Sequence, residues 1–313
     1  MTSALDAASS RHGITHCRVL VHDDLVYSAG PQDEPLPIHS IRKSIVSALF
    51  GQLIGDGRVS LDATLDELGI DDSPHLTPTE KSATLEHLLT SSSGVYLPLE
   101  SPTSYDVFTN TAVPWPRRES SSPGTEFHYS NWNFNVLGEV YQRVSGTALF
   151  VAIDRMLAQP LGFHDWDPLT HGRLHYGSDP VGATARYPNY AMSLSPRDLA
   201  RFGQLYCAGG TWRGHEVVSS EWVERSTRPL VATGLADPFG HYGYLWWVRG
   251  ADSASPLPPG SFSAVGVGGQ VLSVVPSHGL VMVAMCDNSR GGNAGMFIPD
   301  EVMSAVLGLP SLS

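Results

Sequence analysis

Strand-like runs lie near both ends of this 313-residue chain, and helical and loop-like segments fill the middle. A β-hairpin is predicted near the N-terminus, where Cys17 to Val21 and Leu25 to Ser28 flank a turn at residues 22–24. A second hairpin is predicted from Gln270 to Val275 and from Leu280 to Met285. Strands at both ends with helices between favour a central antiparallel sheet, assembled from the two termini and interrupted by a helical insertion.

Helices are predicted where apolar residues recur at helical spacing and a breaker ends the pattern. Apolar residues follow Ser40 at four-residue spacing until the glycines at positions 55 and 57, so we expect Ser40 to begin a helix. Further helices are predicted over Leu85–Leu89, Asn133–Val144, Ala148–Leu157, Pro196–Tyr206 and Pro299–Leu307. We expect a sheet lobe of residues 1–60 and 180–313, a mainly helical lobe of residues 61–179, and an active site in the cleft between them.

Charge and composition exclude several functional classes. The chain has 19 basic and 31 acidic residues, a formal net charge of −12, and no basic run that would neutralise phosphates. We therefore expect neither nucleic acid nor an anionic membrane surface as a partner. Cys17, Cys207 and Cys286 are odd in number and far apart, which favours neither a disulfide framework nor a thiolate metal site. Because no leader-like or membrane-spanning apolar run is found, we expect a cytoplasmic location.

Lys43 is the residue whose chemistry most needs an explanation. Lys43 and Lys81 are the only lysines, beside seventeen arginines. Arginine stays protonated, whereas a desolvated lysine can lose its proton and act as a base. Ser40 stands three residues earlier, at a predicted helix N-terminus where free N–H groups favour developing negative charge. Residues three apart share a helix face, so the pair has the geometry of a nucleophile with its base.

A tyrosine provides a second element of a candidate catalytic set. In Tyr129-Ser130-Asn131, the tyrosine hydroxyl could relay the serine proton, and the asparagine could orient the lysine or the substrate. The same Tyr-x-Asn pattern recurs at Tyr187-Pro188-Asn189. We favour the first copy, because Pro123 to His128 leads into it and an apolar helix follows.

Simpler interpretations of the same residues stay open. Ser40 and Lys43 could form an ordinary helix start with a snorkelling lysine. Tyr129 could be a core tyrosine with a satisfied hydroxyl, and Asn131 could be a plain helix N-cap.

Other kinds of site have weaker support. His171 and His175 have the offset of a metal-binding pair, but Gly172 disfavours a helix there and no third ligand follows, so we expect no metal. Gly266 to Gln270 lacks the last glycine of a dinucleotide fingerprint and precedes a predicted strand. The chain has no Gly-x-Ser-x-Gly, which disfavours an α/β-hydrolase. We expect no cofactor.

Taken in order, these motifs resemble those of the serine β-lactamase and penicillin-binding superfamily, in particular its class C-like branch of esterases, peptidases and 6-aminohexanoate-dimer hydrolases. Ser40-Ile41-Arg42-Lys43 resembles the S-x-x-K motif, Leu88 to Gly94 a leucine-threonine-serine-glycine loop, and Pro123 to Asn131 the family segment ending in Tyr-Ser-Asn. Similar landmarks follow at Asp198–Gly203, Tyr242–Trp247 and Gly266–Gln270. The resemblance implies a β-lactamase/transpeptidase-like α/β fold of the α+β type, with helices flanking the central sheet.

The third family motif is altered in this chain. Ala264-Val265-Gly266 stands where β-lactamases and peptidases of the superfamily have Lys-Thr-Gly or His-Thr-Gly on an edge strand. The basic side chain that would bind a substrate carboxylate is therefore absent, which disfavours β-lactamase and D-Ala-D-Ala peptidase activity. The resemblance implies that the backbone N–H groups of Ser40 and Val267 form an oxyanion hole, with Gly266 and Gly268 beside the substrate.

The expected function combines these residues. We expect a serine hydrolase that cleaves a small-molecule carboxylic ester or linear amide through an acyl-enzyme on Ser40, with Lys43, Tyr129 and Asn131 as the other catalytic residues. Among the aromatic residues, we expect Tyr96, Trp132 and Tyr187 to contact the substrate. One alternative is an acyltransferase or cyclising enzyme of secondary metabolism that uses the same acyl-enzyme. Another is a catalytically silent binding protein of the same fold. The oligomeric state is not predicted.

Overall fold

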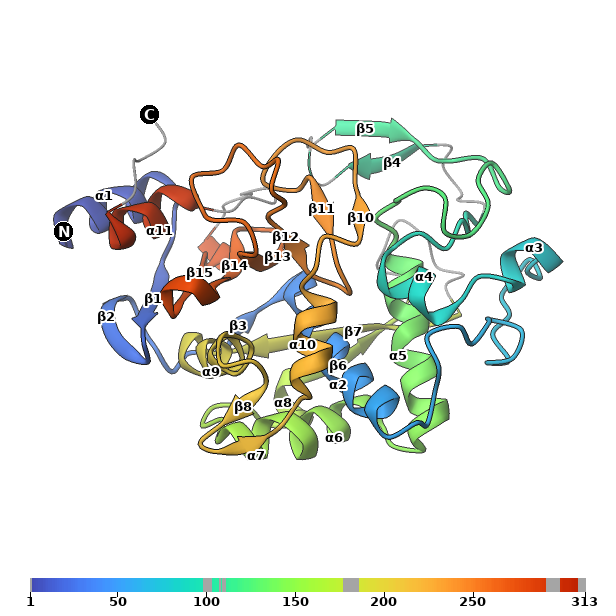
Figure 1. The fold of residues 1–313 in the computed structure, drawn as a ribbon, viewed down its shortest axis with the longest axis horizontal. Helices are drawn as coiled ribbons and strands as arrows, with labels where there is room; N and C mark the ends of the chain where they lie inside the picture. The colour runs from blue at the N-terminus through green and yellow to red at the C-terminus, as the bar shows by residue number, and fades with distance from the viewer. Residues whose placement is uncertain are drawn as a thin grey trace.

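The computed structural model describes residues 2–97, 103–106, 108, 111–176, 186–290 and 299–308. Within them, eight strands form one antiparallel sheet in the order β10-β11-β12-β13-β14-β15-β1-β2 (Figure 1). Their bounds are β1 His16–Val21, β2 Asp24–Ala29, β10 Val231–Ala232, β11 His241–Tyr242, β12 Trp247–Val248, β13 Phe262–Gly266, β14 Gln270–Val275 and β15 Leu280–Met285. Because β1 pairs with β15, the two ends of the chain meet in one sheet, as the sequence predicts.

Both predicted hairpins are confirmed. β1 and β2 are joined through His22 and Asp23, which take positive φ angles of 48° and 70°. β14 and β15 are joined by the 3-10 helix η3 (Pro276–His278) and by Gly279 at φ 58°. The left-handed residues allow the chain to reverse tightly between paired strands.

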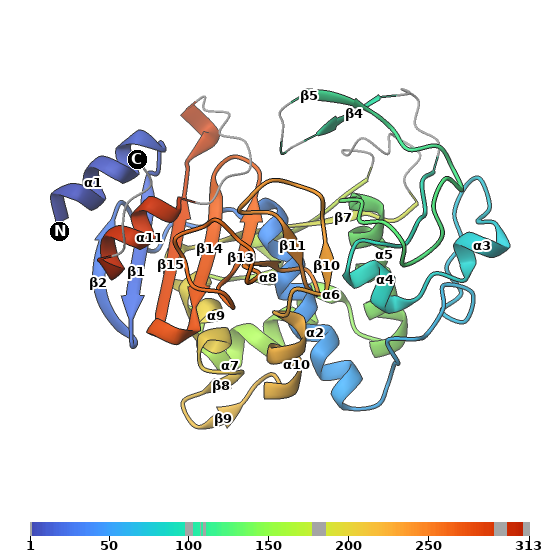
Figure 2. The ribbon, with the colours of Figure 1, turned by 45° about the horizontal axis from the view of Figure 1, so that its top comes forward.

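Helices cover the sheet. α9 (Pro196–Cys207) packs against β14, β15 and β1, and a Cβ at Gly203 would lie 2.6–2.7 Å from the side chains of Val281 and Leu272. The glycine therefore permits a close approach between α9 and the sheet. α1 (Thr2–Arg11) and α11 (Asp300–Leu307) pack against each other at the β1–β2 end of the molecule (Figure 2).

The helix predicted to begin at Ser40 lies at the centre of the molecule. A 3-10 turn, η1 (His39–Ile41), leads into α2 (Arg42–Gly55), and residues 42–51 are all buried. α2 contacts α5 (Asn131–Ser145), α6 (Leu149–Ile153) and α10 (Ser220–Ser226). A helix buried on all sides has a fixed position, so the side chains at its N-terminus are held firmly.

The remaining elements are short. They are α3 Pro78–Lys81, α4 Leu85–Leu89, the π-helix η2 Asp154–Ala158, α7 Gln159–Leu161, α8 Pro168–His171, η4 Asn288–Arg290, and the strands β3 Leu36–Pro37, β4 Thr103–Asp106, β5 Thr111–Pro114, β6 Gly172–His175, β7 Asn189–Leu194, β8 Thr211–Trp212 and β9 His215–Glu216. α4 coincides with its predicted range, whereas the helix predicted over Ala148–Leu157 is α6 followed by η2. β3, β7 and β6 form a small sheet. In it, β6 lies before position 180 in the sequence and pairs with β7, which lies after it. The division into lobes at residues 60 and 180 stays a prediction.

Candidate active site

Ser40, Lys43 and Tyr129 meet at the N-terminus of α2. Lys43 Nζ donates hydrogen bonds to Ser40 Oγ at 2.7 Å and to the Tyr129 hydroxyl at 2.8 Å. The lysine is 3% exposed, whereas the serine and the tyrosine are half-buried. The amine lies 4.4 Å from the centre of the Tyr129 ring and 4.3 Å from that of Phe134. The structure thus brings three of the four predicted catalytic side chains into direct contact, and the lysine is buried whereas its two partner residues are partly exposed.

The backbone before Ser40 has an unusual conformation. His39 has a positive φ of 47°, a region that non-glycine residues rarely occupy. The turn is held by the Ile38 N–H, which donates to the Met192 carbonyl at 3.0 Å, and by the Ile41 N–H, which donates to the Ile38 carbonyl at 3.1 Å. Strained residues held by their surroundings cluster at functional sites. Here the strained residue immediately precedes the candidate nucleophile.

Gly266 brings the end of β13 against the backbone of η1. A Cβ at this position would lie 2.5 Å from the Ile38 carbonyl oxygen and 3.1 Å from Ser40 N. Any larger residue would therefore push β13 away from the nucleophile. Among the described residues, β12 pairs with Phe262 and Ser263 of β13, and Ala264 to Gly266 pair with β14. This close approach fits the predicted oxyanion hole, because Val267 follows Gly266 directly.

Two side-chain amides hold the turn that follows Val267. Asn288 Nδ2 and Gln270 Nε2 donate to the Gly268 carbonyl at 2.9 Å and 3.1 Å. Gly268 has a φ of 82°, and a Cβ there would lie 2.4 Å from Asn288 Nδ2. The turn therefore requires glycine, which gives Gly268 a role in shaping the loop. Its predicted contact with substrate stays a prediction.

Ser91 fixes the segment that carries Tyr129. Its Oγ donates to the His128 carbonyl at 2.7 Å and accepts from the Ser130 N–H at 3.4 Å. Its carbonyl accepts from the His128 N–H at 2.8 Å. Ser91 is fully buried and has a positive φ of 56°. The loop of Leu88 to Gly94 is thus hydrogen-bonded to the residues on both sides of Tyr129. The sequence marked this loop only by its resemblance to a family landmark and did not predict this role.

Asn131 is the first residue of α5 and is half-buried. The N-cap of α5 is Ser130, so the interpretation of Asn131 as a plain helix N-cap is wrong. Asn131 lies two residues after Tyr129, but its role toward Lys43 or the substrate stays a prediction.

The three aromatic residues predicted to contact substrate are buried in the packing of the protein. Tyr96, Trp132 and Tyr187 are 3–4% exposed. The Tyr96 hydroxyl lies 2.8 Å from Ser121 Oγ, Trp132 Nε1 donates to Asp72 Oδ2 at 2.8 Å, and the Tyr187 hydroxyl donates to the Asp71 carbonyl at 2.7 Å. Packing and these internal bonds account for all three residues without a substrate.

A different set of aromatic residues surrounds Tyr129. Trp247 stacks on the Tyr129 ring with 5.6 Å between ring centres, and Phe108, Phe127, Phe239 and Tyr242 all contact Trp247. Sequence reasoning missed these residues, although the landmark of Tyr242 to Trp247 contains two of them. The neighbouring Trp246 packs against Phe202 and Tyr206 in the core instead.

Burial and the neighbouring Tyr129 raise the pKa of Tyr242 well above its usual range. The Tyr242 hydroxyl therefore stays protonated and is a poor candidate for a proton relay. This leaves Tyr129, whose hydroxyl contacts Lys43, as the tyrosine for that role.

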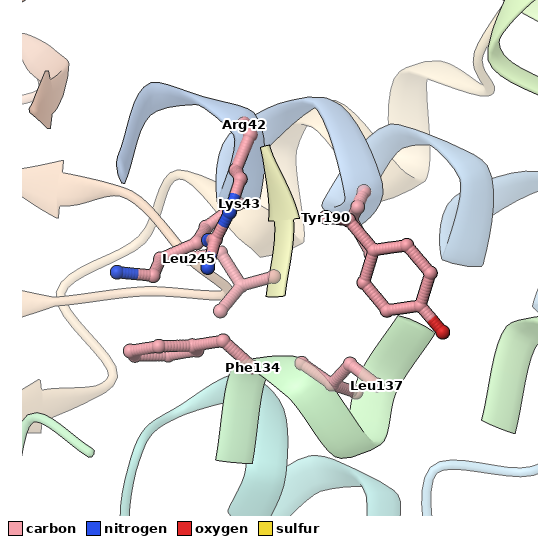
Figure 3. Close-up of a pocket in the computed structure, with 7 residues that line it drawn as sticks. Arg42, Lys43, Phe134, Leu137, Tyr190 and Leu245 are labelled. Atoms are coloured by element: carbon pink, nitrogen blue, oxygen red, sulfur yellow. The ribbon is translucent and has the colours of Figure 1, made fainter. Parts of the chain in front are cut away.

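A small pocket lies beside the Lys43 side chain (Figure 3). It is lined by Arg42, Lys43, Val46, Phe134, Leu137, Tyr190 and Leu245. Arg42 is buried, and its Nε donates to Asn189 Oδ1 at 2.9 Å. The second Tyr-x-Asn segment therefore also reaches α2, but at the residue before the lysine.

In the described part of the chain, His, Cys, Asp and Glu side chains do not gather in groups of three or more that could bind a metal ion. Every helix in the same described ranges is too short or too polar to cross a bilayer.

Residues 17–300 match the Beta-lactamase family model. The chain belongs to the Beta-lactamase family. It is 29% identical over 167 residues to the 6-aminohexanoate-dimer hydrolase of Paenarthrobacter ureafaciens, covering 51% of this chain and 39% of that protein. It is 30% identical over 155 residues to esterase EstB of Burkholderia gladioli, covering 43% of this chain and 38% of that protein. The chain thus matches well under half the length of these two relatives.

The fold of this chain is also similar to that of a solved penicillin binding protein from Bacillus halodurans. The TM-score is 0.67 with 18% identity, over 97% of this chain and 99% of the other. The predicted β-lactamase/transpeptidase-like fold is confirmed. Family membership, together with the contacts of Ser40 and Lys43, makes this chain a serine hydrolase.

Proposed function

We propose that this protein cleaves a carboxylic ester or a linear amide of a small molecule through an acyl-enzyme on Ser40. The observation that carries the proposal is the hydrogen-bonded set in which Lys43 Nζ lies 2.7 Å from Ser40 Oγ and 2.8 Å from the Tyr129 hydroxyl. A nucleophile and a base within this distance can exchange a proton during attack. The names of the esterase and amide-hydrolase relatives support the same reaction class.

The proposed reaction has two stages. Lys43, as a neutral amine, removes the proton of Ser40 while Oγ attacks the substrate carbonyl carbon. The carbonyl oxygen becomes an oxyanion, which the N–H groups of Ser40 and Val267 stabilise. As the oxyanion collapses, the bond between the carbonyl carbon and the leaving group breaks, and the Tyr129 hydroxyl protonates the leaving alcohol or amine and recovers a proton from the Lys43 ammonium. Water then attacks the acyl-enzyme and gives its proton to the Lys43 amine. The bond to Ser40 Oγ breaks, Oγ takes that proton back, and the carboxylic acid leaves.

The residues beside the oxyanion hole favour a substrate without a carboxylate at this position. Ala264, Val265 and Gly266 are buried and apolar, so this strand provides no cation to bind one. We therefore propose neutral esters or amides as substrates and do not propose β-lactam hydrolysis. We also propose a cytoplasmic location, a small molecule as substrate, and neither nucleic acid nor a membrane surface as a partner.

Release of p-nitrophenol from p-nitrophenyl acetate tests the proposal. Wild-type protein and a Ser47→Ala control should turn over, because Ser47 is a fully buried serine of α2 that lies beside Tyr206 in the core. Ser40→Ala should lose turnover, and Lys43→Arg should be nearly as impaired because arginine does not release its proton. Intact mass on the quenched wild-type reaction should show one acetyl adduct.

Equal rates in wild type and Ser40→Ala, with no adduct, would contradict the proposal and favour a silent protein of the same fold. Adding an alcohol or an amine as acceptor separates hydrolysis from acyl transfer. Acetate as the main product supports hydrolysis, and an acetylated acceptor as the main product would overturn it.

A further inference from the structure

We propose that the aromatic residues around Tyr129 bind the leaving group of the substrate, and that the enzyme therefore prefers esters or amides of flat, ring-bearing alcohols or amines. This inference rests on the proposed function. We call Phe108, Phe127, Tyr129, Phe239, Tyr242 and Trp247 the aromatic shelf.

The shelf is built from three separate segments of the chain around one buried ring. Trp247 is 2% exposed, and its ring centre lies 5.2 Å from that of Phe108, 6.0 Å from Phe127 and 5.6 Å from Tyr129. These three neighbours are half-buried. Phe239 and Tyr242 are buried and contact Trp247 at 4.9 Å and 4.6 Å. The partly exposed surface of the shelf is thus made of Phe108, Phe127 and Tyr129.

This surface adjoins the reacting atoms. Tyr129 belongs to the shelf through its ring and to the catalytic set through its hydroxyl, which lies 2.8 Å from Lys43 Nζ. The Phe108 ring meets the Tyr129 ring edge-on, with 5.4 Å between centres and 80° between planes. A substrate carbonyl at Ser40 therefore has apolar ring surface on the Tyr129 side.

The direction of proton transfer decides which half of the substrate faces the shelf. In the proposed reaction, Tyr129 protonates the heteroatom of the leaving group, so that atom must come within hydrogen-bond distance of the Tyr129 hydroxyl. The rest of the leaving group then extends along the rings that surround Tyr129. Aromatic side chains pack best against other flat rings, in offset or edge-to-face arrangements. The acyl group, on the other side of the carbonyl carbon, does not meet the shelf.

A pair of acetate esters isolates this interaction. Benzyl acetate and 2-methoxyethyl acetate give the same acetyl-enzyme, and their alcohols have similar acidity, so kcat/KM compares only the leaving groups. Acetate release is measured for wild type, Phe108→Ala, Phe127→Leu and a Phe150→Ala control. Phe150 is half-buried in α6 and pairs with Tyr190 away from the shelf.

Wild type should prefer the benzyl ester. Phe108→Ala should lower kcat/KM for benzyl acetate by about tenfold and change that for 2-methoxyethyl acetate by less than about twofold, the size expected for one aromatic pair. Phe127→Leu should shift the preference in the same direction, because the Phe127 ring also contacts Trp247, and this second variant keeps the test open if Phe108→Ala does not fold. Phe150→Ala should leave the ratio unchanged.

Equal losses on both esters in the two shelf variants would overturn the inference, as would a wild type with no preference for the benzyl ester. A fluorophosphonate probe separates this failure from failure of the proposed function. Labelling of Ser40 without leaving-group preference contradicts the inference alone, whereas absence of labelling in folded wild type contradicts the proposed function.

Discussion

The two Tyr-x-Asn segments have contrasting surroundings. Tyr129 is half-buried, and its hydroxyl accepts a hydrogen bond from Lys43 Nζ. Tyr187 is 4% exposed, and its hydroxyl donates to the carbonyl of Asp71 at 2.7 Å. The first hydroxyl meets a group that can exchange a proton with it, and the second meets a backbone oxygen that cannot. The tripeptide pattern alone does not decide a catalytic role, because the partner of the hydroxyl does.

The two asparagines also differ in position. Asn131 begins α5, on the Tyr129 side of the site. Asn189 begins β7, and its Oδ1 accepts from buried Arg42 Nε at 2.9 Å. Both segments thus lie beside the N-terminal turn of α2, but they are tied to successive residues of it. If this difference holds, substitutions in the Tyr129 segment should lower activity, whereas substitutions in the Tyr187 segment should lower stability.

The largest contrast is expected between the two tyrosines in activity. Tyr129→Phe removes the proposed proton donor to the leaving group and should lower kcat by about 10²–10⁴-fold. Tyr187→Phe should change kcat by less than about threefold, because its hydroxyl bonds a backbone carbonyl. Steady-state hydrolysis of an ester with a poor leaving group, such as ethyl acetate, measures both. Similar losses in the two variants would remove the basis for assigning the relay to Tyr129.

A smaller contrast is expected between the asparagines. Asn131→Ala should lower kcat by about tenfold, the value of one well-placed hydrogen bond. Asn189→Ala leaves the Arg42 Nε–H without this acceptor and should lower the free energy of unfolding by about 1–3 kcal/mol, with kcat less affected. Urea unfolding followed by fluorescence, together with kcat, checks both. An Asn131→Ala enzyme with full activity would show that this residue is not catalytic.

Ser91 should affect the reaction rate indirectly, by holding Tyr129 in position. Ser91→Ala removes the two side-chain bonds that flank the tyrosine and should lower kcat severalfold, on the order of fivefold, with KM unchanged. The matched control is Ser92→Ala, because Ser92 is also buried and its Oγ lies 2.9 Å from Thr90 Oγ1 within the same loop. If both variants lose stability but neither loses kcat, Ser91 is only a loop residue.

Tyr187 should contribute to stability. Tyr187→Phe leaves the Asp71 carbonyl without its hydroxyl donor and should lower the free energy of unfolding by about 1–2 kcal/mol. Thermal unfolding at neutral pH provides an independent measurement beside urea. An unchanged midpoint would mean that the bond to Asp71 contributes little.

The smallest effect is expected at low pH, in the segment that holds Tyr187. Hydrogen bonds from the Leu76 N–H and from His75 lower the pKa of the Asp71 carboxyl to about 2. A lowered carboxyl pKa stabilises the folded state above the ordinary value near 3.8, and this contribution is lost as the pH falls toward 2. Asp71→Asn should therefore reduce the pH dependence of unfolding between these values. Identical pH profiles for variant and wild type would contradict this assignment.

Local sequence patterns predicted much of the fold. The hairpins, the helix after Ser40 and the helix over Leu85–Leu89 follow from alternation, helical spacing and breakers, which act over a few residues. Helix α1 and the two-residue strands β10 to β12 were not predicted, because α1 has little amphipathic pattern and such short strands depend on their neighbours in the sheet.

In the candidate site, too, contacts between residues close in sequence could be predicted, and contacts made only by the tertiary fold could not. Ser40 and Lys43 are three residues apart, in η1 and in the first turn of α2 that follows it directly, so their contact can be inferred from spacing. Tyr129 was chosen over Tyr187 from its flanking residues, and the contact with Lys43 agrees with that choice. The shelf could not be predicted, because Phe108, Phe127 and Trp247 meet only through the tertiary fold. The choice of Tyr96, Trp132 and Tyr187 relied on aromatic character alone, which does not distinguish a packed ring from a binding one.

The rate at which a fluorophosphonate probe labels Ser40 tests the central claim most directly. Wild type and Tyr187→Phe should gain one adduct at equal rates, with peptide mapping placing it on Ser40. Tyr129→Phe should label more slowly, Lys43→Arg slower still, and Ser40→Ala not at all. Labelling of another residue, or equal rates in wild type and Lys43→Arg, would contradict the account of Ser40 as a nucleophile activated by Lys43.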